Sequence, residues 1–207
     1  LLGAEALMAA GFGFPSHAIR APETLVVVHL VAIGWLSLLM CGALIQFVPV
    51  LVAGPLRHPE LPFPALVFLI AGLAGLVLGF LGMAGHAVGP LPWLPLGAAG
   101  LATGFALIIL TLARTMWASR PLGLPTRFVA AGLVALAGAV SLGAIFSFAL
   151  GGWTTNAALM QLTSQAIPIH AALGLGGWLT FTAMGVSYRL LAMFMLAPEA
   201  DRRTSKF

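Results

Sequence analysis

Residues 167–194 read IPIHAALGLGGWLTFTAMGVSYRLLAMF, a long apolar run with one histidine near its start and a Gly-Gly-Trp-Leu block shortly after it. Residues 28–51, VHLVAIGWLSLLMCGALIQFVPVL, have the same design. Laying the Gly-Trp-Leu block of one stretch on that of the other also superposes Gly42 on Gly185 without a gap. The chain therefore contains two copies of one helical unit, and we expect these two helices and their histidines to carry the function.

The composition excludes a water-soluble domain. Hydrophobic residues make up 61% of the 207 residues and charged residues 7%, whereas a soluble domain has about a quarter charged residues. The basic residues behind the net charge of +4 form no patch, so we expect membrane lipid rather than nucleic acid as the surrounding partner. A single cysteine, Cys41, provides neither a disulfide framework nor a multi-cysteine metal site.

Five segments are long and apolar enough to cross a bilayer, which takes about 20 residues. They are residues 24–52, 62–83, 92–117, 126–150 and 165–197. Because backbone polar groups find no water in lipid, such runs must be helices. The sequence therefore predicts an all-α, polytopic transmembrane bundle of about five spans.

Three regions follow from these boundaries. Residues 1–22 contain an apolar run too short to span a membrane, and we expect them to be the end of a preceding helix and an outer loop, in a fragment of a longer protein. Residues 23–198 form the five-helix bundle, and residues 199–207 form a tail.

The arginines orient the bundle. Eight of the nine basic residues lie at or beyond the end of the bundle that holds residues 53–61, residues 118–125 and the C-terminal segment, and Arg20 alone lies at the other end. Cytoplasmic loops carry the excess of Lys and Arg in membrane proteins. We therefore expect a cytoplasmic tail.

His29 and His170 are the candidate ligands of a cofactor or metal. Each lies about five residues inside the start of its helix, and the two helices run in the same direction, so the imidazoles can share one depth in the outer half of the membrane. Neutral imidazole ligates transition metals and heme iron. Two depth-matched histidines on different helices are what a six-coordinate heme would require.

Other interpretations of the histidines stay open. The pair could be structural, each ring bonding only a neighbouring carbonyl or hydroxyl. Another metal, such as copper, could use His86 or His17 with a nearby methionine such as Met83. His58 lies in a loop beside Glu60 on the other side and is expected to be solvated.

The two stretches resemble a known family. The carrying residues are His29 followed by Gly34-Trp35-Leu36, and His170 followed by Gly177-Trp178-Leu179 and the run from Met184 to Arg189. They resemble membrane proteins related to heme-copper oxidase subunit I, above all the shorter oxidase-like bacterial relatives. The resemblance implies histidines that ligate b-type heme at the outer ends of helices, in the inner membrane of a bacterium, with the histidine side periplasmic.

The sequence departs from the family at the histidines. Where a His-x-His pair is expected, the second copy has Ala172 and the first has Val27. His29 superposes on Ala172, and residues two apart point about 200° apart on a helix, so the two histidines could face different pockets. Tyr188 is the single tyrosine and lies far from them. A complete oxygen- or nitric-oxide-reducing site is therefore absent from these residues, and no catalytic residue is assigned.

The sequence thus predicts a membrane protein that holds heme b near the periplasmic face, for electron transfer or small-gas binding, beside other membrane subunits of a respiratory complex. The alternative is a non-redox structural or assembly subunit that kept the fold and lost the cofactor.

Overall fold

Five long apolar helices form the body of this computed structural model, which describes residues 1–196. They are Pro22–Val52, Pro62–Met83, Trp93–Trp117, Leu124–Leu150 and Ile167–Phe194, named spans 1 to 5 below. The predicted all-α bundle of five spans is confirmed, since residues 1–196 contain only helices and their connections. The predicted tail, residues 199–207, lies outside the described residues.

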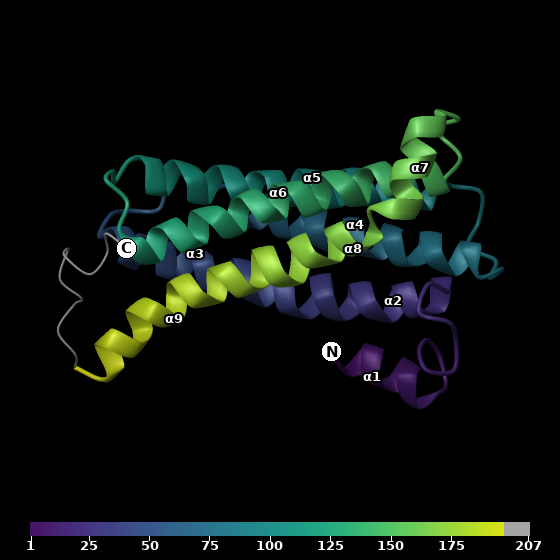
Figure 1. Ribbon diagram of the computed structural model, residues 1–207, viewed down its shortest axis with the longest axis horizontal. Helices are drawn as coiled ribbons and strands as arrows, with labels where there is room; N and C mark the ends of the chain where they lie inside the picture. The colour runs from purple at the N-terminus through teal and green to yellow at the C-terminus, as the bar shows by residue number, and fades with distance from the viewer. Residues whose placement is uncertain (197–207) are drawn as a thin grey trace.

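Spans 1 and 5 are each built from three pieces. Span 1 consists of α2 (Pro22–Val31), η1 (Ala32–Ser37) and α3 (Leu38–Val52), and span 5 of α8 (Ile167–Ala171), η2 (Ala172–Thr180) and α9 (Phe181–Phe194). Spans 2 to 4 are the single helices α4 (Pro62–Met83), α5 (Trp93–Trp117) and α6 (Leu124–Leu150). Two short helices, α1 (Leu2–Ala9) and α7 (Ala157–Gln165), are the other helices of residues 1–196 (Figure 1).

The packing places spans 1 and 5 on different neighbours. Helices α4, α5 and α6 pack in chain order, α2 packs on α4, and all three pieces of span 5 pack on α6. Spans 1 and 5 also meet each other, at η1 with η2 and at α3 with α9. Figure 1 shows α9 crossing the bundle obliquely. The two copies of the repeated unit are therefore neighbours in space. At their histidine-bearing ends they have different supports, whereas α3 of span 1 also contacts α5 and α6.

Glycines bring α4 and α5 into backbone contact. A Cβ added at Gly72 would collide with the backbone of Leu101, and one at Gly97 with the backbone of Leu76. Lipid tails are as apolar as leucine, so close backbone approach, rather than hydrophobic burial, drives helix association in membranes. The small residues of these helices are thus explained by packing.

The connection before span 5 contains a short helix. Residues 151–164 separate the last two predicted spans, and α7 occupies their second half. Asn156 begins this helix, because its side-chain Oδ1 accepts hydrogen bonds from the backbone N–H groups of Ala158 and Leu159. Asparagine is among the preferred N-cap residues, so the signal for α7 was present in the sequence.

Gly72→Ala should destabilise the bundle. The added methyl group has no room against α5, and overpacking of this kind costs about 1–3 kcal/mol. Thermal unfolding in detergent, followed by tryptophan fluorescence, should show a lower midpoint than the parent. Gly42→Ala is the matched control, since nothing lies within 4 Å of a Cβ at Gly42; equal midpoints for the two variants would contradict the packing.

Candidate functional site

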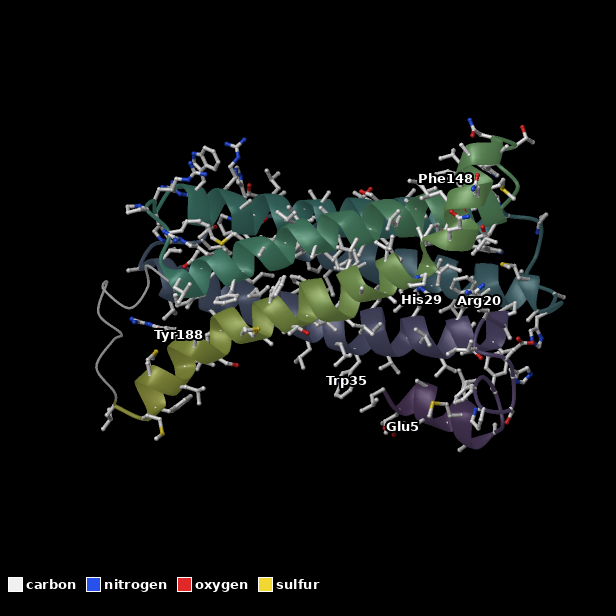
Figure 2. The ribbon with its side chains drawn as sticks, in the orientation of Figure 1. Glu5, Arg20, His29, Trp35, Phe148 and Tyr188 are labelled. Carbon is white, nitrogen blue, oxygen red and sulfur yellow. The ribbon has the colours of Figure 1, made fainter. Side chains whose placement is uncertain are left out.

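His29 of α2 and His170 of α8 face each other. Their ring centroids lie 6.4 Å apart, and the ring planes differ by 29°. The structure therefore confirms that the two histidines share a depth. The alternative, in which the two rings face different pockets, is wrong. Figure 2 shows His29 between α2 and α8, while Trp35 projects from the opposite side of span 1.

His29 is held by its own helix. Its Nδ1 lies 2.7 Å from the carbonyl oxygen of Leu25, one turn earlier. Because a carbonyl oxygen only accepts hydrogen bonds, Nδ1 carries the proton. On the side of span 2, the ring packs against Phe80 with the centroids 5.2 Å apart.

His170 is held by a neighbouring helix. Its Nδ1 donates to the carbonyl oxygen of Ala139 in α6, 2.9 Å away. A Cβ added at Gly143 would lie 3.1 Å from Cε1 of His170, so the missing side chain makes room for the imidazole. The ring of Phe146 meets it edge-on at 5.6 Å between centroids. Residues of α6 therefore fix both the tautomer and the orientation of His170.

Both histidines thus have the same tautomer. In neutral imidazole, a proton on Nδ1 leaves the lone pair on Nε2. Within residues 1–196, neither His29 nor His170 makes a hydrogen bond through Nε2. A metal-bound histidine almost always donates its other ring N–H to a carbonyl, carboxylate or water, and both rings already have this arrangement.

The spacing and donor set of the pair fit heme better than a metal held by protein alone. The ring centroids are 6.4 Å apart, a separation at which one nitrogen of each ring could lie about 2 Å from a single metal ion. Residues 1–196 contain no group of three or more His, Cys, Asp or Glu that could hold a metal ion. Two imidazoles would suffice to hold heme, because the porphyrin would supply the other four nitrogens.

The remaining histidines lie elsewhere. His17 and His86 both pack against Phe12, at 6.1 Å and 6.5 Å between ring centroids, and the Nε2 of His17 is 3.8 Å from the Glu23 carboxylate. No ring contact in residues 1–196 joins either of them to His29 or His170. The structure therefore does not bring His86 to the facing pair.

The loop histidine has the solvated environment that the sequence suggested. His58 is exposed, and its Nδ1 lies 3.2 Å from Oε1 of the exposed Glu60. The backbone N–H of Glu60 and the nearby His58 lower the pKa of the Glu60 carboxyl. This pair lies at the opposite end of the spans from His29 and His170.

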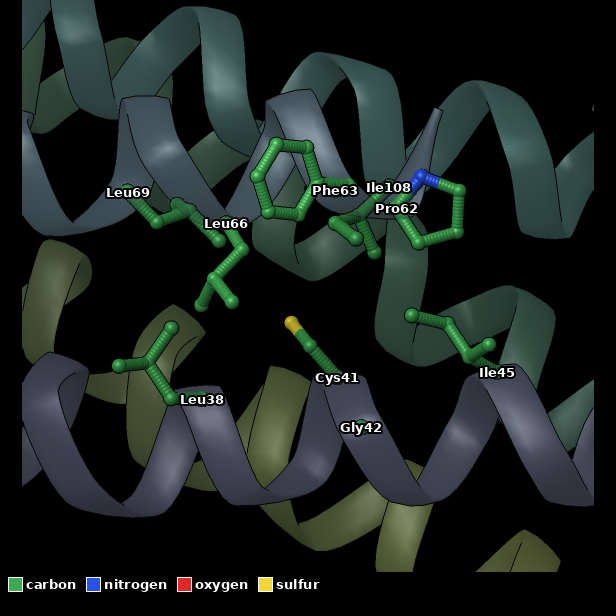
Figure 3. A pocket seen from close by; sticks show the side chains of 9 residues that line it. All are labelled: Leu38, Cys41, Gly42, Ile45, Pro62, Phe63, Leu66, Leu69 and Ile108. Carbon is green, nitrogen blue, oxygen red and sulfur yellow. The ribbon is translucent and has the colours of Figure 1, made fainter. Parts of the chain in front are cut away.

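A separate groove of about 310 Å³ lies between α3 and α4. Figure 3 shows the thiol of Cys41 pointing into it from one wall, opposite Leu66 and Phe63. The rest of its lining is also apolar. The groove offers a ligand no hydrogen bond beyond that weak thiol, so it carries no recognisable chemistry.

Sequence reasoning missed the residues that support the histidines. Nothing in the sequence singled out Phe80, Phe146, Gly143 or the Ala139 carbonyl. Fold and site together define a multi-pass helical membrane protein with a facing pair of intramembrane histidines. No family model, no curated protein and no solved structure matches the chain.

Nitrogen NMR of heme-free protein labelled with ¹⁵N-histidine should show His29 and His170 as neutral, Nδ1-protonated rings, because both Nδ1 atoms donate to carbonyl oxygens. Their signals can be assigned with His29→Gln and His170→Gln. His58 is the internal comparison, since its exposed ring contacts a side-chain carboxylate rather than a backbone carbonyl. Nε2-protonated rings at positions 29 and 170 would contradict the hydrogen bonds described.

Proposed function

We propose that the chain binds one b-type heme between His29 and His170 and serves in electron transfer. The observation that carries the proposal is the facing pair, with each Nδ1 bound to a carbonyl and each Nε2 left as a donor to metal. Bound heme would supply one-electron redox chemistry at its iron.

The protein's own residues would hold and tune the group. The two carbonyl hydrogen bonds orient the imidazoles and raise their basicity as ligands. Phe80 and Phe146 pack against the rings and would keep water from them. If both histidines held the iron, they would leave no coordination site for an outside ligand, which favours electron transfer over the binding of a small gas.

The surroundings of the site are part of the proposal. The five spans place the protein in lipid. We propose the inner membrane of a bacterium, with the histidine end periplasmic, and other membrane subunits as partners for electron exchange. The resemblance of the two repeated stretches to oxidase-like membrane proteins supports this environment.

The alternative function is that of a structural or assembly subunit without cofactor. The favouring observation is that each Nδ1 already has a protein partner, so the histidines are stable without heme. The absence of a second histidine at Val27 and Ala172 points the same way. Heme binding by the purified protein separates the two functions.

Purified protein, expressed with a heme precursor or reconstituted with hemin, should show the Soret and α bands of a low-spin, six-coordinate b-type heme. Removing one axial ligand should weaken heme binding more than about tenfold, since loss of even a supporting partner costs 10–100-fold. Absorbance titration of His29→Ala and His170→Ala measures this loss.

His17→Ala and His58→Ala are the controls and should bind heme like the parent. A parent protein without a Soret band, or a band that survives both substitutions in one chain, would refute the heme proposal and leave the structural function. A band that shifts when carbon monoxide is added to the reduced parent would favour gas binding instead.

Reporter fusions should place the C-terminus in the cytoplasm. Eight of the nine basic residues lie on that side, and positive charge marks cytoplasmic loops. Green fluorescent protein fused after Phe207 should fluoresce, and alkaline phosphatase inserted near Gly89 should be active. The reverse pattern would put the histidine pair on the cytoplasmic side.

A further inference from the structure

We infer that a hydrogen bond between Trp178 and Ser37 is a positioning bridge that sets the register and orientation of the two histidine-bearing spans. The indole Nε1–H of Trp178 donates to Oγ of Ser37 over 3.1 Å. Trp178 is 1% exposed and Ser37 is 5% exposed. The role in positioning ligands rests on the proposed heme site, whereas the bridge itself is a feature of the fold.

The bridge and the histidine pair are two contacts between the same two spans. Ser37 follows His29 by eight residues, and Trp178 follows His170 by the same number. At 1.5 Å per residue these two contacts lie roughly 12 Å apart along the helices. Because spans 1 and 5 run in the same direction, a hydrogen bond at one contact determines which residues face each other at the second contact.

The register in space differs from the register of the sequence repeat. The repeat aligns Trp178 with Trp35, 143 positions earlier, whereas the bridge joins Trp178 to Ser37 across 141 positions. His29 and His170 are also 141 positions apart. The bridge therefore holds the register in which the imidazoles meet, although the repeat by itself would pair His29 with Ala172.

A direct bond between spans 1 and 5 is needed because their histidine-bearing ends pack on different helices. Helix α2 packs on α4, while α8 and η2 pack on α6. If one span moved by one residue relative to the other, the facing side chains would be displaced by about 1.5 Å along the helix and rotated by about 100° about its axis. The bridge joins the two π-helical segments η1 and η2, and such segments are rare and frequently occur at functional sites.

The second copy of each bridge residue supplies a matched control. Trp35 aligns with Trp178 but is 40% exposed. Thr180 aligns with Ser37, yet its hydroxyl bonds the carbonyl of Leu175 in its own span. Substituting Trp35 or Thr180 removes an indole or a hydroxyl at the position equivalent to Trp178 or Ser37, and it leaves the bridge itself intact.

Trp178→Phe and Ser37→Ala should both change the low-spin ferric electron paramagnetic resonance spectrum of the heme-loaded protein, because its anisotropy depends on the angle between the imidazole planes. Heme retention should fall about fivefold, the effect of one net hydrogen bond. The double variant should lose no more than either single variant, since both remove one interaction. Ser37→Thr, which keeps a hydroxyl, should restore the parent spectrum.

Trp35→Phe and Thr180→Val should leave spectrum and retention unchanged. If the heme-loaded bridge variants keep the parent spectrum and retention, or if the controls change them equally, the inference is overturned.

The heme-free protein separates this inference from the proposed function. Spin labels on cysteines introduced at the exposed positions Leu39 and Leu175, with Cys41 replaced by serine, report the distance between spans 1 and 5. The distribution should be narrow in the parent and broad in Trp178→Phe. If the parent does not bind heme but the distance distribution of Trp178→Phe is broad, the heme site is refuted and the bridge remains as a bond that holds the two spans together. If the distribution of Trp178→Phe is as narrow as that of the parent, the bridge is refuted.

Discussion

Inside a bilayer no water is available to hydrogen-bond with the backbone, so every backbone polar group must find its partner within the protein, and side-chain donors do best with a protein acceptor too. The hydroxyl of Thr115 donates to the carbonyl of Thr111 one turn earlier in its own helix, and that of Thr182 does the same to Trp178. The indole of Trp178 and the imidazole of His170 instead reach a neighbouring span. The constraint that makes the spans helical therefore also determines where the polar side chains point.

The same constraint gives the histidine pair its chemistry. Once a carbonyl has taken the proton of each Nδ1, the lone pair of each ring must lie on Nε2. Two such rings facing each other are the feature on which the proposed heme site rests. Their hydrogen bonds are made to backbone oxygens of helices, so the fold itself fixes the orientation of both imidazoles.

The repeated unit is used asymmetrically. Both copies have a π-helical segment around the Gly-Trp-Leu block, and the two segments end at the equivalent residues Ser37 and Thr180. Trp178 is buried and hydrogen-bonded, whereas its equivalent Trp35 is half-exposed. His170 donates a hydrogen bond to α6, whereas His29 donates one to its own helix. Two similar helices with different neighbours thus contribute different parts to one site.

The sequence by itself determined the five spans, because length and apolarity decide whether a segment can cross lipid. It also predicted that His29 and His170 share a depth, since depth follows from position along helices of known direction. Only the tertiary structure decided that the two rings face each other, that Gly143 leaves room for His170, and that Trp178 reaches Ser37. These features depend on how each helix is rotated about its axis, and that rotation is set by packing against neighbours distant in the chain.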